Sequence, residues 1–512
     1  MNQLKVGAAL NYVSICLNMV VGLLYTPYML RMLGQSEYGL YSLAASIIAY
    51  LTVLDLGFGN AIIRYTAKFR AEGKQREQEE MFGMFFILYI GIGVIAMIAG
   101  SVLSLNVENM FSRAMTESEV HRTRIMLWLM TFNLAFTFPM SIWGSIMSAY
   151  ERFVFQRLVS IVRSVLNPVI MILLLVVGYK AVAMVVVTTI FNVATLLVNW
   201  WYCKYKLAIK IRFAKFKWGF LKEVSIYSFW IFLNAIMDRI YWSTGQFVLG
   251  IYKGSVAIAV YSVAIQLVSM YMLFSTAIAS VFLPKITSMV TKGGNNKDFS
   301  ILFIRTGRLQ YIVMAFIISA FIVFGRQFII LWAGNDYAEA YYLTLMFFVP
   351  LTIPQIQNLG IVILQARNQM KFRSVLYIII ALCSLGLSVL LAQRYGGLGC
   401  AFSTGLALLL GQGLIMNIYY QRVQEINIKE FWIEILKMST IPIIFVVVCV
   451  VLSNIFDLTN ITVCQLTICI ICYTALYIPL FFKFGMNGEE QRLLLLPLTI
   501  VASKIKSKNK GL

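Results

Sequence analysis

The chain has 512 residues, of which 60% are hydrophobic and only 12% are charged, and its mean hydropathy is +0.82. Soluble domains carry about 25% charged residues, so this composition excludes a soluble enzyme, a nucleic-acid-binding domain and a disordered chain. The net charge of +21 must be explained by where the basic residues lie.

Apolar runs of about 20 residues, each long enough to cross a bilayer, recur from one end of the chain to the other. They predict about 14 transmembrane helices. In chain order the predicted spans are 7–30, 38–62, 81–103, 125–148, 158–178, 181–202, 224–250, 257–283, 309–332, 341–364, 375–392, 398–420, 438–456 and 461–482. Continuously apolar stretches such as 171–177 lack the alternation that barrel strands require. The sequence therefore predicts an all-α polytopic membrane protein.

The basic residues are distributed unequally between alternate connections of these spans. About 32 lysines and arginines fall on one side and about 8 on the other, and an incorrect span count would scramble this asymmetry. By the positive-inside rule, both termini are predicted to be cytoplasmic. Most of the net charge is therefore a topology signal, and part of it favours contact with anionic membrane lipids.

The chemical inventory favours a protein without catalytic or metal sites. His121 is the single histidine of the sequence, and a solvated surface residue is the simplest interpretation of it. Cys469 and Cys472 form a CxxC pair inside an apolar span with no second pair, so packing explains them better than metal binding. The sequence contains no GxxxxGK[ST] motif, the phosphate-binding loop of many ATPases, so ATP-driven transport by this chain alone is unsupported. We expect no enzyme activity and no cofactor.

Ionisable residues inside spans are the default functional candidates in a polytopic protein. Asp238 and Arg239 lie near the centre of the seventh predicted span, with Asn234 one turn before Asp238. Neighbouring residues point about 100° apart on a helix, so the two charges do not simply neutralise each other. They predict either a wet cavity or a buried ion pair between helices.

Other polar residues interrupt the first half of the chain. Arg163 and Asn167 share a face of the fifth span, where snorkelling to the membrane surface is the alternative for the arginine. Asp55 lies in the second span and Asn18 in the first. Lipid would penalise these groups, so each is expected to face protein or a cavity.

The tenth span contains two prolines, Pro350 and Pro354, followed by Gln355, Gln357 and Asn358. Each proline removes a backbone donor and clashes with the preceding turn, so a kink is expected here. Broken helices near the membrane midplane often mark transporter sites or hinges. A static kink filled by neighbouring side chains is the alternative.

A weak internal repeat divides the chain. Leu33-Gly34 followed by Tyr41-Ser-Leu-Ala44 resembles Leu249-Gly250 followed by Tyr261-Ser-Val-Ala264. Parallel repeats with a site between the halves are a common transporter plan. The predicted parts are an N-terminal bundle (1–202, spans 1–6), a basic cytoplasmic linker (203–223), a C-terminal bundle (224–437, spans 7–12), two extra spans (438–482) and a basic cytoplasmic tail (483–512).

Three groups of residues together carry a family resemblance. They are Leu33-Gly-Gln-Ser-Glu-Tyr38-Gly-Leu-Tyr41 with Asp55-Leu-Gly57 and Arg64; Asp238, Gly250, Tyr261-Ser-Val-Ala264 and Phe282-Leu-Pro284-Lys; and Ala366-Arg-Asn368 with Arg394-Tyr-Gly396-Gly-Leu-Gly399-Cys-Ala401. With these motifs the chain resembles the Wzx-type polysaccharide (oligosaccharide-lipid) flippases of the multidrug/oligosaccharidyl-lipid/polysaccharide exporter superfamily.

The resemblance implies two pseudo-repeated helical bundles around a central cavity in the bacterial cytoplasmic (inner) membrane. It implies that undecaprenyl-diphosphate-linked oligosaccharide is flipped from the cytoplasmic to the outer leaflet by alternating access, for assembly of lipopolysaccharide or capsule. Arg31, Arg163 and Arg239 are then candidates for binding the diphosphate. A proton or sodium gradient coupled through Asp55 or Asp238 is a hypothesis for the driving force. Polysaccharide polymerase and chain-length machinery are the expected partners, and nucleic acid is not.

Three other functions remain open on the sequence. A drug/cation antiporter of the same superfamily would share the fold but would favour an acidic cavity. A lipid II flippase would carry a related diphosphate-linked substrate. A polytopic glycan polymerase is disfavoured, because the longest predicted outside loop, 106–124, is too short for a catalytic domain.

Overall fold

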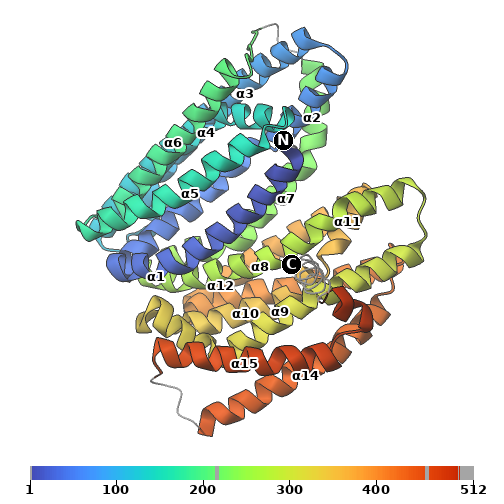
Figure 1. Cartoon of the computed structure of the whole chain (residues 1–512). Coiled ribbons are helices and arrows are strands. Elements are labelled where there is room, and N and C mark those ends of the chain that lie inside the picture. Colours follow the sequence, from blue (N-terminus) through green and yellow to red (C-terminus); the bar gives the residue numbers. More distant parts are fainter. Residues whose placement is uncertain (1–2, 214–217, 456–460, 494, 496–512) are drawn as a thin grey trace, which may run out of the picture. The chain divides into compact units, whose positions relative to one another are not determined.

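The computed structural model describes residues 3–213, 218–455, 461–493 and 495, and these residues form helices without any β-strand (Figure 1). The first part contains α1 (Gln3–Leu51), η1 (Thr52–Asp55), α2 (Phe58–Ala71), α3 (Gln75–Phe111), α4 (Glu117–Ala149), α5 (Phe153–Val176), α6 (Ala181–Tyr205) and α7 (Trp218–Tyr252). The second part contains α8 (Ser255–Thr291), α9 (Asn296–Ala333), η2 (Asn335–Tyr337), α10 (Ala340–Ile356), α11 (Asn358–Ala366), α12 (Lys371–Leu408), η3 (Leu409–Ile415), α13 (Met416–Arg422), α14 (Ile428–Ile455) and α15 (Val463–Phe484).

Within the described part of the chain, ten helices are long and apolar enough to cross a membrane, or eleven if the bent pair α10–α11 is one span. Two of these, Leu10–Ala71 and Lys371–Arg422, contain 62 and 52 residues. A straight helix of about 60 residues would be about 90 Å long, roughly three times the hydrocarbon thickness. Each therefore holds two spans. With α7 added, the helices follow the predicted spans in the same order.

Glycines mark the places where two spans meet inside α1 and α12. Gly34 has φ 75° and ψ 170°, and Gly396 has φ 57° and ψ −131°. Side chains with a Cβ rarely adopt such positive φ values, whereas glycine does so readily. One span can therefore end and the next begin without a loop between them.

The described residues group into two compact units. Unit 1 comprises residues 1–265 and 371–404, and unit 2 comprises residues 266–370 and 405–512, less the residues outside the description. Contacts thus group part of α12 with the N-terminal helices, whereas the predicted boundaries follow chain order. Those boundaries stay a prediction, and residues 214–217 of the linker and 496–512 of the basic tail lie outside the described residues.

Each unit has its own aromatic core. In unit 1, the fully buried Phe85 and Tyr89 pack against Phe58, with ring centroids 5.8 Å and 6.5 Å from it. In unit 2, Tyr473 stacks on Tyr477, with ring centroids 5.5 Å apart, along one face of α15. Aromatic pairs in offset or edge geometry add to the free energy gained by burial.

Candidate functional site

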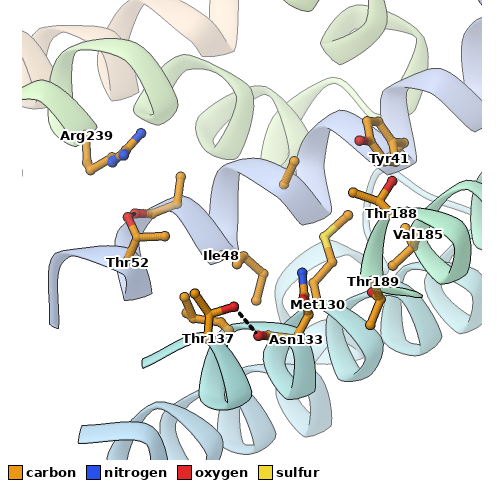
Figure 2. Close-up of a pocket in the computed structure, with 13 residues that line it drawn as sticks. Tyr41, Ile48, Thr52, Met130, Asn133, Thr137, Val185, Thr188, Thr189 and Arg239 are labelled. Atoms are coloured by element: carbon orange, nitrogen blue, oxygen red, sulfur yellow. Dashed lines mark hydrogen bonds between the residues drawn. The ribbon is translucent and has the colours of Figure 1, made fainter. Parts of the chain in front are cut away.

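A pocket of about 300 Å³ lies within unit 1 (Figure 2). Its 13 lining residues come from α1, η1, α4, α6 and α7, and they are Tyr41, Ala45, Ile48, Ala49, Thr52, Met130, Asn133, Leu134, Thr137, Val185, Thr188, Thr189 and Arg239. Figure 2 shows Arg239 and Thr52 toward one end and Tyr41, Thr188 and Thr189 toward the other. The polar groups are hydroxyls, an amide and one guanidinium, and none of the 13 side chains is acidic.

A chain of hydrogen bonds extends this polar surface to Arg163. The Nη1 atom of Arg163 donates to Oδ1 of Asn192 at 3.0 Å. The Nδ2 atom of Asn192 donates in turn to Asn133 Oδ1 and to Thr137 Oγ1, both at 2.8 Å. The dashed line in Figure 2 marks the bond from Thr137 Oγ1 to the Asn133 carbonyl, one turn earlier in α4. Asn192 of α6 thus joins the guanidinium on α5 to two residues that line the pocket.

Asp238 and Arg239 have different surroundings, as expected from their spacing on α7. Arg239 is half-buried and lines the pocket, whereas Asp238 does not, and its charged neighbours are Arg373 and Arg239. Arg373, in the first turn of α12, donates from Nη1 to Asn234 Oδ1 at 3.3 Å, and its guanidinium lies 4.7 Å from the centre of the Tyr377 ring. The carboxylate of Asp238 therefore lies in a basic cluster beside α12.

Arg373 is not among the residues predicted for the site, because it lies just before the predicted span 375–392. The structure begins α12 at Lys371, so Arg373 belongs to the helix. Asn133, Thr137 and Asn192 are not among the predicted site residues either. A signal for Asn133 and Thr137 was available, because residues at i and i+4 share one face of a helix.

Other predicted residues of unit 1 lie outside the pocket lining. Asp55 ends η1 and accepts a hydrogen bond from Tyr89 Oη at 2.9 Å. Asn18 is exposed, with Nδ2 3.5 Å from Ser14 Oγ, and Arg31 is exposed as well. The Oδ1 atom of Asn167 is buried and accepts no hydrogen bond from the described residues.

The predicted kink of the tenth span is present in unit 2. Helices α10 and α11 meet at an angle of 41° at Gln357, after Pro350 and Pro354. Gln355 and Gln357 are only 6% and 3% exposed, and the Nε2 atom of Gln357 donates to Asn417 Oδ1 at 2.7 Å.

Side chains from α8 and α9 also hold this break. Ser275 Oγ donates to the Gln355 carbonyl at 2.6 Å and accepts from Gln310 Nε2 at 3.1 Å. Asn358 Nδ2 lies 3.4 Å from the same hydroxyl. The side-chain amides of Gln357 and Asn358 thus contribute to fixing the bend, whereas the Oε1 atom of Gln355 is buried and accepts no hydrogen bond from the described residues. The role of the prolines as a hinge stays a prediction.

Residues 4–290 match the family described as "Polysaccharide biosynthesis protein". The chain is 21% identical over 404 residues to a "Putative O-antigen transporter" of Shigella flexneri, covering 77% of this chain and 92% of that protein. Among solved structures it is similar to a lipid II flippase MurJ in an inward closed conformation, with a TM-score of 0.71, 15% identity, and coverage of 94% of this chain and 99% of that one. It is also similar to an inward-facing multidrug resistance MATE family transporter of the MOP superfamily, with a TM-score of 0.61, 14% identity, and coverage of 81% and 99%.

These similarities define a multi-pass membrane transporter with the fold of the MOP superfamily, and not an enzyme. Because the family match covers more than half of its length, the chain belongs to the polysaccharide biosynthesis protein family. The predicted resemblance and the predicted all-α polytopic fold of about 14 spans are thereby confirmed.

Proposed function

We propose that this transporter flips an undecaprenyl-diphosphate-linked oligosaccharide from the cytoplasmic to the outer leaflet by alternating access. One observation supports this most: the pocket of unit 1 combines the guanidinium of Arg239 with hydroxyl and amide groups and has no acidic lining residue. Arginine suits a diphosphate in a low-dielectric site because its planar fork donates paired, charge-assisted hydrogen bonds. Hydroxyls and amides such as Thr188 and Asn133 are suitable partners for a sugar.

Arg163 is the second candidate for the anionic group. Its only hydrogen bond within the described residues goes to a neutral amide, that of Asn192. A guanidinium held by an amide keeps its full charge, so it adds positive potential beside the pocket without a carboxylate to cancel it. The lipid tail would remain in the bilayer during transport, so the protein would not need to enclose the whole substrate.

The orientation and the setting belong to the same proposal. The unequal distribution of basic residues supports cytoplasmic termini in a bacterial inner membrane. A polysaccharide polymerase and chain-length machinery would receive the flipped substrate. The driving force is a proton or sodium gradient coupled through Asp238 or Asp55, since Asp55 lies in a helix long and apolar enough to cross a membrane and Asp238 lies in α7, the seventh predicted span.

The test of the main proposal is the location of the lipid-linked oligosaccharide in cells that lack this gene. We expect it to accumulate in the inner leaflet and surface glycan to be lost, with both restored by the wild-type gene. Normal surface glycan without accumulation, in a strain freed of other flippases, would contradict the proposal. Accumulation of lipid II instead would assign the peptidoglycan precursor as the substrate.

The coupling hypothesis has a separate test. Asp238→Asn and Asp55→Asn each remove one carboxylate while keeping its size. Transport into the outer leaflet of vesicles would be compared with and without an imposed proton or sodium gradient. The coupling residue is the one whose replacement abolishes the gradient dependence, and an unchanged dependence in both variants would eliminate both roles.

A further inference from the structure

A second pocket, of about 570 Å³, opens on the surface of unit 2 between η3, α13 and the start of α14. Its walls include the exposed aliphatic side chains of Leu414, Ile418 and Ile433. These helices cross the membrane, so the groove has the apolar character that an acyl chain requires. Residues 409–415 form a π-helical segment, a distortion that occurs frequently at functional sites.

Two cations stand at one end of this groove. Arg422 ends α13 and Lys429 lies in the first turn of α14, and both are exposed and line the pocket. Neither forms a salt bridge with a described residue. The neighbouring acids are engaged elsewhere, because Glu430 accepts from Asn427 Nδ2 at 2.8 Å and Glu425 accepts from Asn296 Nδ2 at 2.6 Å. The backbone N–H groups of Ile428 and Lys429 are already satisfied by Gln421 Oε1.

An aromatic residue lies between the charged end and the aliphatic walls. Trp432 lines the groove, and its indole N–H donates to Asn417 Oδ1 at 3.2 Å. Tryptophan is enriched at membrane–water interfaces, where its apolar ring and polar N–H suit both environments. The same Asn417 oxygen accepts from Gln357 Nε2 at the break between α10 and α11. One amide therefore connects the groove to the bent helix.

From these features we infer that the groove is a binding site for an anionic phospholipid of the surrounding bilayer. The phosphodiester would lie between Arg422 and Lys429, and one acyl chain would run along Leu414, Ile418 and Ile433. Charge complementarity selects this occupant. The headgroup of a zwitterionic lipid carries a cation beside its phosphate, and the two basic side chains would repel that cation. The inference depends on the chain spanning a membrane and not on the proposed oligosaccharide substrate.

The experiment measures quenching of Trp432 by brominated lipids in reconstituted vesicles. Vesicles of phosphatidylcholine would contain a minor fraction of either brominated phosphatidylglycerol or brominated phosphatidylcholine. Because the chain has nine tryptophans, the fluorescence of Trp432 is obtained as the difference between the fluorescence of the wild type and that of Trp432→Phe. We expect the charged lipid to quench this difference signal more strongly, with a preference of about fivefold for each cation.

Variants of the two basic residues at the end of the groove test whether their charges cause the preference for the anionic lipid. Arg422→Gln with Lys429→Gln should reduce the preference to about one, and each single change should reduce it in part. Lys437→Gln is the matched control, because Lys437 is on α14 but pairs with Glu434 at 2.8 Å and does not line the groove; its preference should equal that of the wild type. High salt should weaken the wild-type preference.

The inference would be overturned by equal quenching by both lipids in the wild type, or by a preference that survives in the double variant. A wild-type dimer that the groove variants dissociate would assign the groove to a second copy and would overturn it too. If Trp432→Phe alters folding, lipid counting by native mass spectrometry replaces quenching. The wild type should then retain at least one phosphatidylglycerol more than the double variant, and equal numbers would contradict the site. A failed flippase assay would leave this result unaffected.

Discussion

Arg308 of unit 2 has surroundings opposite to those of two arginines of unit 1, Arg163 and Arg239. In unit 2, Arg308 is 6% exposed, and its Nε and Nη2 atoms donate to the carboxylate of Glu490 at 2.6 Å and 2.9 Å. Its Nη1 atom also donates to Glu434 at 2.5 Å. In unit 1, Arg163 contacts the amide of Asn192, and Arg239 lines a pocket, without a salt bridge to any residue that the structure describes.

This difference teaches which buried arginine is structural. A guanidinium with two carboxylates has its charge and its donors satisfied, so it holds helices together and has little left for a ligand. A guanidinium without a salt bridge to a described residue, such as Arg163 on its neutral amide or Arg239 at the pocket, keeps donors and positive potential available in a medium of low dielectric constant, where an anionic substrate would be attracted to it. The proposed site therefore lies in unit 1, and Arg308 is assigned to stability.

The largest expected effect concerns the paired arginine. Glu490→Ala would leave Arg308 with one carboxylate in a buried position, and removing one partner of a buried pair costs about 3–5 kcal/mol. We expect a clearly lower unfolding temperature of the purified protein, measured by its intrinsic fluorescence. Glu489→Ala is the control, because Glu489 is 70% exposed and reaches Arg305 only at 3.5 Å. Equal unfolding temperatures of the two variants would contradict the structural role of Arg308.

Replacement of the pocket arginine, Arg239, should reduce transport but leave thermal stability nearly unchanged. Arg239→Gln removes a charge-assisted bond to an anionic substrate worth about 1.5–3 kcal/mol, so transport should fall by about tenfold to a hundredfold. Thermal stability should stay near that of the wild type, because no ion pair within the described residues is broken. The readout is the rate of lipid-linked oligosaccharide transfer in vesicles, with the exposed Arg152→Gln as control. Loss of stability together with activity would show that the two arginines do not differ as argued.

A smaller loss is expected when Arg163 is disconnected from the pocket. Asn192→Ala removes two neutral hydrogen bonds, to Asn133 and Thr137, and the bond from the charged Arg163. Because none of these bonds is made to the substrate, we expect the loss of transport to correspond to no more than one neutral hydrogen bond, about 0.5–1.5 kcal/mol. Transport should fall by about threefold to tenfold in the same vesicle assay. Thr195→Val on the same helix is the control, since its hydroxyl bonds only the Phe191 carbonyl of α6. If the two variants behave alike, Asn192 does not connect Arg163 to the site.

The smallest effect is expected at the bend of unit 2. Pro354→Ala restores one backbone donor, but hydrogen bonds from Ser275 and Gln357 still hold the break. We therefore expect transport to change by no more than about threefold, which corresponds to less than one neutral hydrogen bond. A loss as large as that of Arg239→Gln would establish the bend as a hinge and would place function in both units.

Most of the helices could be predicted because the bilayer imposes one simple rule on the sequence. The sixth predicted span, 181–202, agrees closely with α6, which runs from Ala181 to Tyr205, because Gly178 and Lys180 interrupt the apolar run before it. The first turns of helices were harder to predict. The residues there are selected by contact with solvent and by helix capping rather than by contact with lipid. In α4, for example, Thr116 and Glu119 form a capping box outside the predicted span.

The composition of the pocket was predictable only in part. A charge inside an apolar span is conspicuous, so the sequence singles out Arg239, which lines the pocket, and Arg163, which connects to the lining through Asn192. Asp238 is equally conspicuous but does not line the pocket. Asn192 is one of two asparagines in an apolar helix, and its importance comes from contacts with α4 and α5. Arg373 reaches Asn234 across 139 positions of sequence. Such pairings depend on which helix faces lie together, and one sequence does not specify that.

The single-glycine junctions at Gly34 and Gly396 also matter for anyone who handles this protein. Where two spans join at one residue, there is no loop for a protease to cut, for an epitope tag to occupy or for an antibody to recognise. Reporter insertions at either junction should disrupt the connection between the two spans instead of mapping the topology. Residues 112–116, between α3 and α4, form a longer connection and are the better place for a label.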